Sequence, residues 1–311
     1  MAGQEGLIVV TGPTCSGKTR CALALARDFP IEVVSADSMQ VYRYMDIATA
    51  KPSPAERAAL PHHIIDVVNP DEDFHAAMFT AMAEDRIGQI RARGRIPVVV
   101  GGTGLYIKAL VYGLAPAPAR SERVRKALRT VMKTRGTAYL ERMLRRLDPG
   151  AAALVRKNDG VRTVRALEVI LMSGRRVSDI YAGHGFRQKR YDVRTACILP
   201  DRDRLFGDID RRTLKMLEDG LFDETRRLLD KGYGPDLRSM QTLAYRHAVA
   251  HLRGECGAQE CIRLIQRDTR RFAKRQITWV KAQQDHVFFA SADTARRTVS
   301  QWLQEEARGP G

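Results

Sequence analysis

The segment Gly12–Thr19 constrains the fold more than any other part of the chain. It reads GPTCSGKT, fits the pattern Gly-x-x-x-x-Gly-Lys-Thr, and follows the apolar run Leu7–Val10. A strand, a glycine-rich loop and a helix in this order are typical of a phosphate-binding loop, because loop N–H groups and the helix N-terminus face phosphate oxygens. We expect Lys18 to neutralise phosphate charge and Thr19 to reach a phosphate or a Mg²⁺ bound to it. The predicted loop comprises Gly12, Pro13, Thr14, Cys15, Ser16, Gly17, Lys18 and Thr19.

Strands and helices alternate over the first 115 residues, which predicts the α/β class. We expect strands over residues 7–12, 31–35, 63–68 and 96–101, and helices over residues 18–29, 75–93 and from about 105. Continuous apolar strands between amphipathic helices indicate a parallel sheet of the phosphate-loop type, covered on both faces. The ligands of such a sheet lie at the carboxyl ends of its strands.

The proline-rich stretch GLAPAPARSER, residues 113–123, marks a boundary. Residues 116–190 are helical and basic in pattern, and a returning strand is expected over 191–200. We therefore predict a catalytic core of residues 1–115 and 191–311, with mostly helical sequence and a short late strand at 286–290. A helical insertion domain is predicted at residues 116–190.

Positive charge is concentrated in that insertion. The whole chain has 52 Lys and Arg against 36 Asp and Glu, and residues 120–190 alone have 19 against 6. A local excess of this size favours a nucleic-acid partner. A basic helical surface that is merely solvated is the alternative.

A carboxylate that could serve the phosphate loop is found after the second predicted strand. In nucleotide triphosphatases an Asp at a strand end holds the Mg²⁺, but the strand at 96–101 ends in GGT and offers none. Asp37 follows the strand at 31–35 and is expected beside the loop, as a metal ligand or a general base. Capping of a helix by Asp37 or Ser38 is the structural alternative.

Six motifs follow one another in order: GPTCSGKT, ADSMQVYRYMDIATAKP, PHHIIDVVNP, RIPVVVGGTGLYIKAL, NDGVRTVRALEV and TRRFAKRQITWVK. Together they resemble the bacterial tRNA dimethylallyltransferases, over residues 6–285. The resemblance implies that a dimethylallyl group passes from dimethylallyl diphosphate to N6 of adenosine 37, next to the tRNA anticodon, with release of diphosphate. The loop would then bind the diphosphate of the donor, with Mg²⁺ as cofactor.

The resemblance also assigns residues to roles. The implied catalytic residues are Asp37, Thr19, Lys18 and Arg212, with Thr19 as the metal ligand and Asp37 as the base that assists N6. Adenosine 37 has to leave the stack of the anticodon loop to reach them. The implied contacts to the tRNA anticodon stem-loop are Asp37, Ser38, Met39, Gln40, Thr103, Arg125, Val161, Arg162, Thr163, Val164, Arg165, Gln241, Thr242, Leu243, Ala244, Tyr245 and Arg246.

The chain departs from the family pattern at three positions near these residues. Gln241 and Ala244 stand where an arginine and a glycine are common, and Asp208 stands where another arginine is common. Arg212 keeps the second arginine of that motif, and we expect it to bind the diphosphate.

Three other functions fit the sequence less well. A free-nucleotide adenylate isopentenyltransferase would not need the basic insertion, and a small-molecule kinase would need the missing aspartate. A noncatalytic RNA-binding module would not need Gly-Lys-Thr and Asp37 together.

Histidines and cysteines add two weaker inferences. His247 and His251, with Cys256 and Cys261, suggest a zinc site, although the cysteines are spaced too widely for a zinc finger. The scattered cysteines, with neither a secretion signal nor an apolar span, predict a reduced, cytoplasmic protein without membrane attachment. We expect a monomer.

Overall fold

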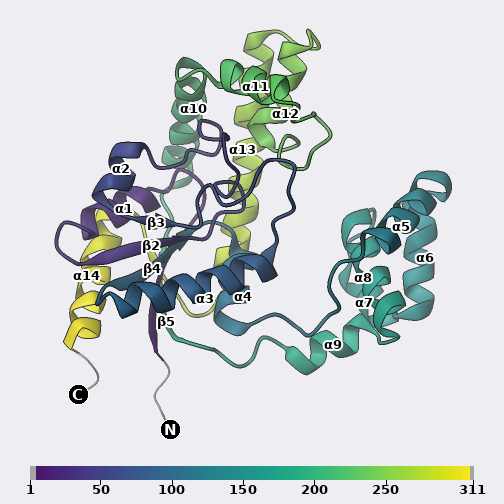
Figure 1. The fold of residues 1–311 in the computed structure, drawn as a ribbon, viewed down its shortest axis with the longest axis horizontal. Coiled ribbons are helices and arrows are strands. Elements are labelled where there is room, and N and C mark those ends of the chain that lie inside the picture. Colours follow the sequence, from purple (N-terminus) through teal and green to yellow (C-terminus); the bar gives the residue numbers. More distant parts are fainter. Residues whose placement is uncertain (1–4, 309–311) are drawn as a thin grey trace. The chain divides into compact units, whose positions relative to one another are not determined.

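The structure, a computed structural model, describes residues 5–308 and confirms the predicted α/β class. Its parallel sheet consists of β1 (Gly6–Thr11), β2 (Ile31–Ser35), β3 (His62–His63), β4 (Ile96–Gly101), β5 (Asp192–Ile198) and β6 (His286–Phe289). The strand order is β3-β2-β4-β1-β5-β6, and neighbours pair in parallel (Figure 1).

The register brings the ends of the central strands to one edge of the sheet. Thr11, the last residue of β1, pairs with Gly101 of β4 on one side and Cys197 of β5 on the other. In β2, Ser35 pairs with Val100 of β4. The segments that leave β1, β2 and β4 therefore start side by side, as the carboxyl ends of a parallel sheet do.

The structure divides into two compact units. The first comprises the residues up to Val111 and those from Arg190 on. Its helices are α1 (Lys18–Leu25), α2 (Pro54–Ala59), α3 (Ala76–Ala92), most of α4 (Gly104–Tyr112), α10 (Arg202–Glu218), α11 (Leu221–Asp230), α12 (Leu243–Leu252), α13 (Ala258–Lys281) and α14 (Ala292–Arg308).

Helices α1 and α14 pack together against the sheet, whereas α3 packs on β2 and β4. Leu25 of α1 and Val299 of α14 join Ile8, Val10 and Val98 in one buried cluster. Alternate residues of β1 face this cluster, which is the period expected of a strand.

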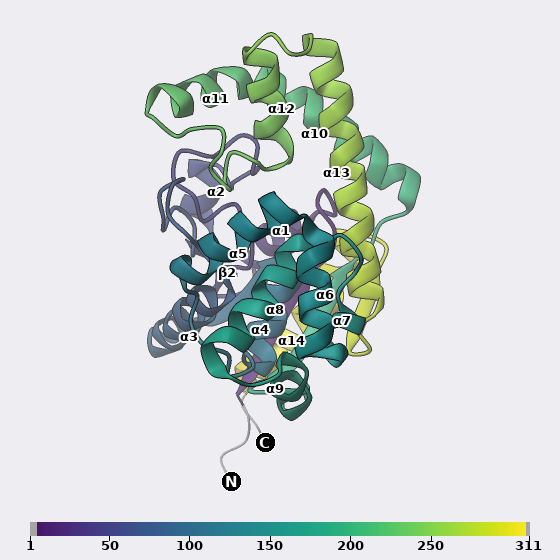
Figure 2. The ribbon, with the colours of Figure 1, turned by 90° about the vertical axis from the view of Figure 1, so that its right-hand side faces the viewer.

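Helices α10, α11, α12 and α13 pack against one another in the upper part of Figure 2. Leu205 and Ile209 of α10 pack with Ala273 of α13, and Cys15 of the phosphate loop lies against the same cluster. These two helices are thereby fixed beside the loop.

The third predicted strand is wrong in its extent. Residues 63–68 were expected to be extended, but β3 contains only His62–His63. Ile64 and Asp66 have φ angles of 63° and 57°, in the left-handed region, so the chain cannot continue as a strand there. The carboxylate of Asp66 instead accepts hydrogen bonds from Lys51 and Arg57.

The second unit runs from Tyr112 to Lys189. Its helices are α5 (Glu122–Arg135), α6 (Thr137–Leu147), α7 (Pro149–Leu154), α8 (Gly160–Ser173) and α9 (Val177–His184). Leu128, Leu140, Leu144 and Leu167 form the centre of its own core. The insertion predicted at residues 116–190 overlaps this unit, and its contact with tRNA stays a prediction.

Across the described part of the chain, no helix is both long enough and apolar enough to span a bilayer.

Candidate active site

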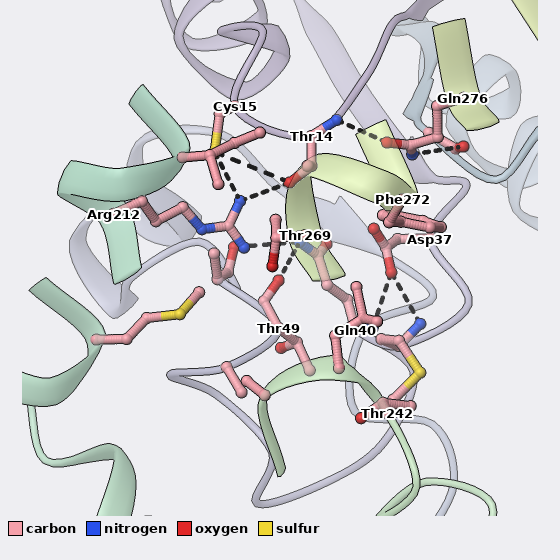
Figure 3. Close-up of a pocket in the computed structure, with 18 of the residues that line it drawn as sticks. Thr14, Cys15, Asp37, Gln40, Thr49, Arg212, Thr242, Thr269, Phe272 and Gln276 are labelled. Carbon is pink, nitrogen blue, oxygen red and sulfur yellow. Dashed lines mark hydrogen bonds between the residues drawn. The ribbon is translucent and has the colours of Figure 1, made fainter. Parts of the chain in front are cut away.

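A cavity of about 640 Å³ lies at the carboxyl edge of the sheet. The phosphate loop, the segments after β2 and β4, and helices α10, α12 and α13 line it (Figure 3). The cavity brings together most residues of the first unit that were predicted to act in catalysis, to bind the diphosphate or to contact tRNA. They are Thr14, Cys15, Ser16, Gly17, Lys18, Thr19, Asp37, Ser38, Met39, Gln40, Thr103, Arg212, Gln241, Thr242, Leu243, Ala244 and Tyr245.

The phosphate loop depends on glycine at its first position. Gly12 has a φ of 141°, and a Cβ there would lie 2.2 Å from the carbonyl oxygen of Ile198. The loop curls around its own lysine, because Lys18 Nζ donates to the carbonyls of Gly12 (3.0 Å) and Pro13 (2.7 Å). Burial lowers the pKa of Lys18 to about 8, although the nearby charge of Asp37 opposes the shift. An anion in the cavity would favour the charged ammonium.

Buried donors beside the loop lack an acceptor. Arg212 of α10 donates from Nη1 to Thr14 Oγ1 (2.8 Å) and to Cys15 Sγ (3.6 Å), as Figure 3 shows. Arg212 Nε and Ser16 Oγ are buried, with no hydrogen-bond partner in the described structure. Such groups cost about 1–3 kcal/mol each when left unsatisfied. Their position therefore favours a ligand rich in acceptor oxygens, such as a diphosphate.

Gln276 of α13 fastens the phosphate loop to the neighbouring strand end. Its Oε1 accepts from the backbone N–H of Thr14 (2.9 Å), and its Nε2 donates to the carbonyl of Gly102 (3.0 Å). No role was predicted for this residue. The one sign of its importance in the sequence is its place within the motif TRRFAKRQITWVK. Its contacts could not be predicted, because its partners lie far away in the sequence.

Asp37 stabilises a turn after β2. Its Oδ1 accepts from the backbone N–H groups of Met39 (2.8 Å) and Gln40 (3.3 Å). Turns and bends follow at residues 38–50 rather than a helix, so the helix-capping alternative is wrong. The turn holds the carboxylate at the cavity, which Phe272 of α13 also lines (Figure 3).

The segment that follows Asp37 is held from two sides. Ser38 donates its backbone N–H to Thr103 Oγ1 (3.0 Å), which connects the ends of β2 and β4. The Gln40 amide accepts from Ser35 Oγ (3.1 Å) and donates to the carbonyl of Ala50 (3.2 Å). These bonds fix the residues predicted to contact the target base.

Glu224 of α11 is a second residue without a predicted role. This buried carboxylate accepts from the backbone N–H groups of Asp46 and Ile47 (both 2.9 Å) and from the hydroxyl of Tyr245 (2.6 Å). Burial raises the pKa of Tyr245 well above its ordinary value, so the hydroxyl remains a donor. The start of α12 is thereby tied to the loop that contains Ala50.

The positions that depart from the family pattern also lie at the cavity. Asp208 forms an ion pair with Arg211, and Gln241 donates to the carbonyl of Pro235 (2.7 Å). Ala244 is buried.

The remaining predicted tRNA contacts lie elsewhere. Arg246 forms an ion pair with Asp268, and the others belong to the second unit. There Arg125 and Arg165 donate to Glu168, which is fully buried. Thr163 and Val164 are buried too, whereas Arg162 is 66% exposed and Val161 is 83% exposed.

The structure argues against the zinc site. Among residues 5–308, no three or more His, Cys, Asp or Glu gather so that they could hold a metal. His251 Nδ1 instead lies 2.9 Å from the carbonyl oxygen of Cys256.

Two family models match the chain. One, described as IPP transferase, matches residues 40–283, and one described as isopentenyl transferase matches residues 5–66. A tRNA dimethylallyltransferase 1 of Syntrophotalea carbinolica is 47% identical over 273 residues, which cover 88% of this chain and 87% of the relative. A tRNA dimethylallyltransferase of Geobacter sulfurreducens is 46% identical over 285 residues, covering 90% and 92%.

Solved structures are similar over almost the whole chain. A tRNA isopentenylpyrophosphate transferase of Bacillus halodurans is 34% identical with a TM-score of 0.71, covering 98% of this chain and 97% of its own. A eukaryotic dimethylallyltransferase acting on tRNA has a TM-score of 0.82 at 24% identity, over 98% and 80%, which shows a shared fold.

Proposed function

The chain belongs to the IPP transferase family and is a tRNA prenyltransferase, and we propose that it transfers the dimethylallyl group of dimethylallyl diphosphate to N6 of adenosine 37. The resemblance of the six motifs to this family is thus confirmed. In the proposed reaction N6 forms a bond to the allylic carbon, that carbon's bond to the diphosphate oxygen breaks, and N6 loses a proton.

The buried donors without acceptors are the main support for diphosphate binding at this cavity. Arg212 Nε and Ser16 Oγ lie beside Lys18 at one cavity, where a diphosphate would accept from all three. Negative charge on the departing diphosphate grows in the transition state, so fixed cations and N–H donors stabilise it more than the bound donor.

We propose that Asp37 accepts the proton that N6 loses. Adenine N6 is a weak nucleophile, and a carboxylate placed to accept its proton assists the attack. The Asx turn uses Oδ1 for backbone bonds and presents the carboxylate at the same cavity as the loop. Ser38, Met39 and Gln40 would contact the extruded base, since they follow directly.

The residues present fit a Mg²⁺ that is held largely by its substrate. Thr19, in the first turn of α1, lines the cavity, and an Mg²⁺ bound by few protein ligands and by diphosphate oxygens needs no carboxylate cluster. When bound, the ion would neutralise charge on the leaving group. Thr19 is the residue we propose to hold it.

The proposal also covers the binding of the RNA, the oligomeric state and the location in the cell. The basic second unit, with the exposed Val161 and Arg162, would bind the anticodon stem-loop, while the first unit holds both reacting groups. We propose that the protein acts as a monomer in the cytoplasm, where tRNA is modified.

The test is transfer of labelled dimethylallyl from its diphosphate to unmodified tRNA. Label should enter the RNA at adenosine 37, located by nuclease digestion and mass spectrometry, and AMP should accept little. Efficient transfer to AMP with none to tRNA would instead establish the free-nucleotide activity. Phosphoryl transfer from ATP at a competent rate would establish a kinase.

A further inference from the structure

A group of arginines surrounds one buried carboxylate where α12 meets α13. The side chain of Asp268, 6% exposed, accepts from Arg246 of α12 and from Arg267 of α13, whose Nε lies 2.9 Å from Oδ1. Arg271 lies 3.5 Å from the same carboxylate, and His247 Nε2 lies 3.0 Å away.

Arg267 faces the side of α13 opposite the active site, and Arg271 lies on the flank between the two sides. Helix α13 lines the cavity with Ile265, Thr269, Phe272 and Gln276, which repeat at the spacing of one helical face, and with Arg275 at the edge of that face. Arg267 is two residues from both Ile265 and Thr269, about 200° around the helix, whereas Arg271 is next to Phe272, about 100° away. The proposed reaction gives neither arginine a role.

Three guanidinium groups share this carboxylate, so the cluster carries excess positive charge. The hydrogen bond from Arg267 holds the pKa of Asp268 well below its ordinary value, and Asp268 stays ionised. Burial lowers the pKa of His247, which leaves the ring neutral near pH 7. The net charge is then +2. One turn earlier on α13, by contrast, Arg263 forms an ion pair with Glu260.

The arrangement also orients the arginines. Arg267 makes two bonds to Asp268, Nε to Oδ1 and Nη2 to Oδ2, so its guanidinium plane is fixed. The arginine side chains stay 39% to 63% exposed, while the carboxylate lies behind them. Each guanidinium has five N–H donors, so several remain for an anion, and prior ordering lowers the entropy lost on binding.

We infer that Arg246, Arg267 and Arg271 form a phosphate-binding site for the RNA backbone of tRNA, with Asp268 as the residue that positions them. This inference rests on the proposed function, because the tRNA substrate supplies the polyanion. Arg246 ends the segment 241–246 whose family resemblance implies a tRNA contact, and the cluster extends that surface onto α13. The competing explanation is an ion-pair network that only fastens α12 to α13.

Equilibrium binding of unmodified tRNA at several salt concentrations distinguishes the two explanations. Arg267→Ala and Arg271→Ala should each weaken binding and lower the slope of log Kd against log salt by about one unit, the value of one phosphate contact. Arg263→Ala is the matched control: it is 63% exposed like Arg271, lies on the same helix, and is neutralised by its own glutamate. Its slope should equal that of the wild type.

Folding and the proposed function are checked in parallel. Arg271→Ala leaves Asp268 paired with Arg246 and Arg267, so this variant should unfold at the wild-type temperature. It therefore still tests the site if Arg267→Ala is unstable. Unchanged slopes in folded variants would overturn the site, as would an equal loss in Arg263→Ala, which would indicate a diffuse basic surface. A wild-type protein that transfers no label to tRNA would mean instead that the proposed function is wrong.

Discussion

At the scale of single residues, Lys18 shows how burial within the phosphate loop affects the binding of an anion. Its ammonium is buried against the carbonyls of Gly12 and Pro13, and burial lowers its pKa from 10.5 to about 8. The charge needed for the diphosphate is therefore partly lost near pH 8 in the free protein, and binding must restore it.

This predicts how donor binding depends on pH. Above pH 8 the free protein holds Lys18 neutral, so binding of dimethylallyl diphosphate requires uptake of a proton. The Kd should rise by up to about tenfold per pH unit above 8 and be nearly flat below 7. Calorimetric titration across this range measures it. Lys18→Met should bind weakly and without this dependence, and a wild-type Kd that is flat up to pH 9.5 would contradict the shift.

A second prediction concerns Asp37. Asp37→Asn keeps an Oδ1 that can accept from Met39 and Gln40, so the turn should survive while the base is removed. Turnover at saturating substrates should fall by about 10²–10⁴, the usual contribution of general acid–base catalysis. Binding of tRNA should change little. Near-normal single-turnover rates would show that another group accepts the proton.

Local residue patterns predicted the loop and Asp37, but not the groups that hold them. The spacing of Gly12–Thr19 depends on backbone geometry within eight residues, so it can be read from the sequence directly. Gln276 bonds to Thr14, which is 262 residues away in the sequence. Glu224 bonds to Asp46, which is 178 residues away. Only tertiary packing brings such pairs together.

At the scale of elements, α8 contains a buried carboxylate that pairs with two of the arginines predicted to contact tRNA. Arg125 of α5 and Arg165 of α8 were expected to contact tRNA, and both turn toward Glu168 of α8. Burial acts to raise the pKa of Glu168, but hydrogen bonds from Arg165, the Ser121 backbone and Arg125 outweigh it and lower the pKa. The charged ends of these arginines therefore help to satisfy a buried anion.

Arg125 and Arg162 should accordingly respond differently to removal. Arg125→Ala leaves Glu168 short of a partner and should lower the free energy of unfolding of the second unit by about 1–3 kcal/mol. Arg162→Ala, at a mostly exposed position, should change it by less than about 0.5 kcal/mol and lower the salt slope of tRNA binding by about one unit. Urea unfolding and tRNA titrations measure both. Equal stability of the two variants would contradict the structural role of Arg125.

Element boundaries were predictable where the pattern was local and failed where long-range contacts decide. The apolar run of β4 and the spacing of α3 agree with the structure to within one residue at each end. The expected strand at 63–68 has the right composition, yet Lys51 and Arg57 hold Asp66 in a left-handed turn. Apolar composition alone could not reveal that constraint.

At the scale of the whole molecule, the second unit is inserted between two points of the first that lie together. The backbone N–H of Arg190 donates to the carbonyl of Val111 at 2.8 Å, so the chain leaves and re-enters the first unit at nearly the same place. Each unit also has its own buried core. A domain whose insertion points are this close can tolerate removal of the insert.

Replacing residues 112–189 by a short Gly-Ser linker should therefore leave a folded first unit. Because the cavity is lined by that unit alone, the shortened protein should bind dimethylallyl diphosphate with a Kd within about threefold of the full chain. Transfer to tRNA at low tRNA concentration should fall on the order of 10³, because phosphate contacts supply much of the affinity for RNA. A folded variant that binds the donor and prenylates tRNA as well as the full chain would show that the second unit does not bind the RNA. A variant that loses donor binding while keeping a cooperative unfolding transition would show instead that the donor site extends beyond the first unit.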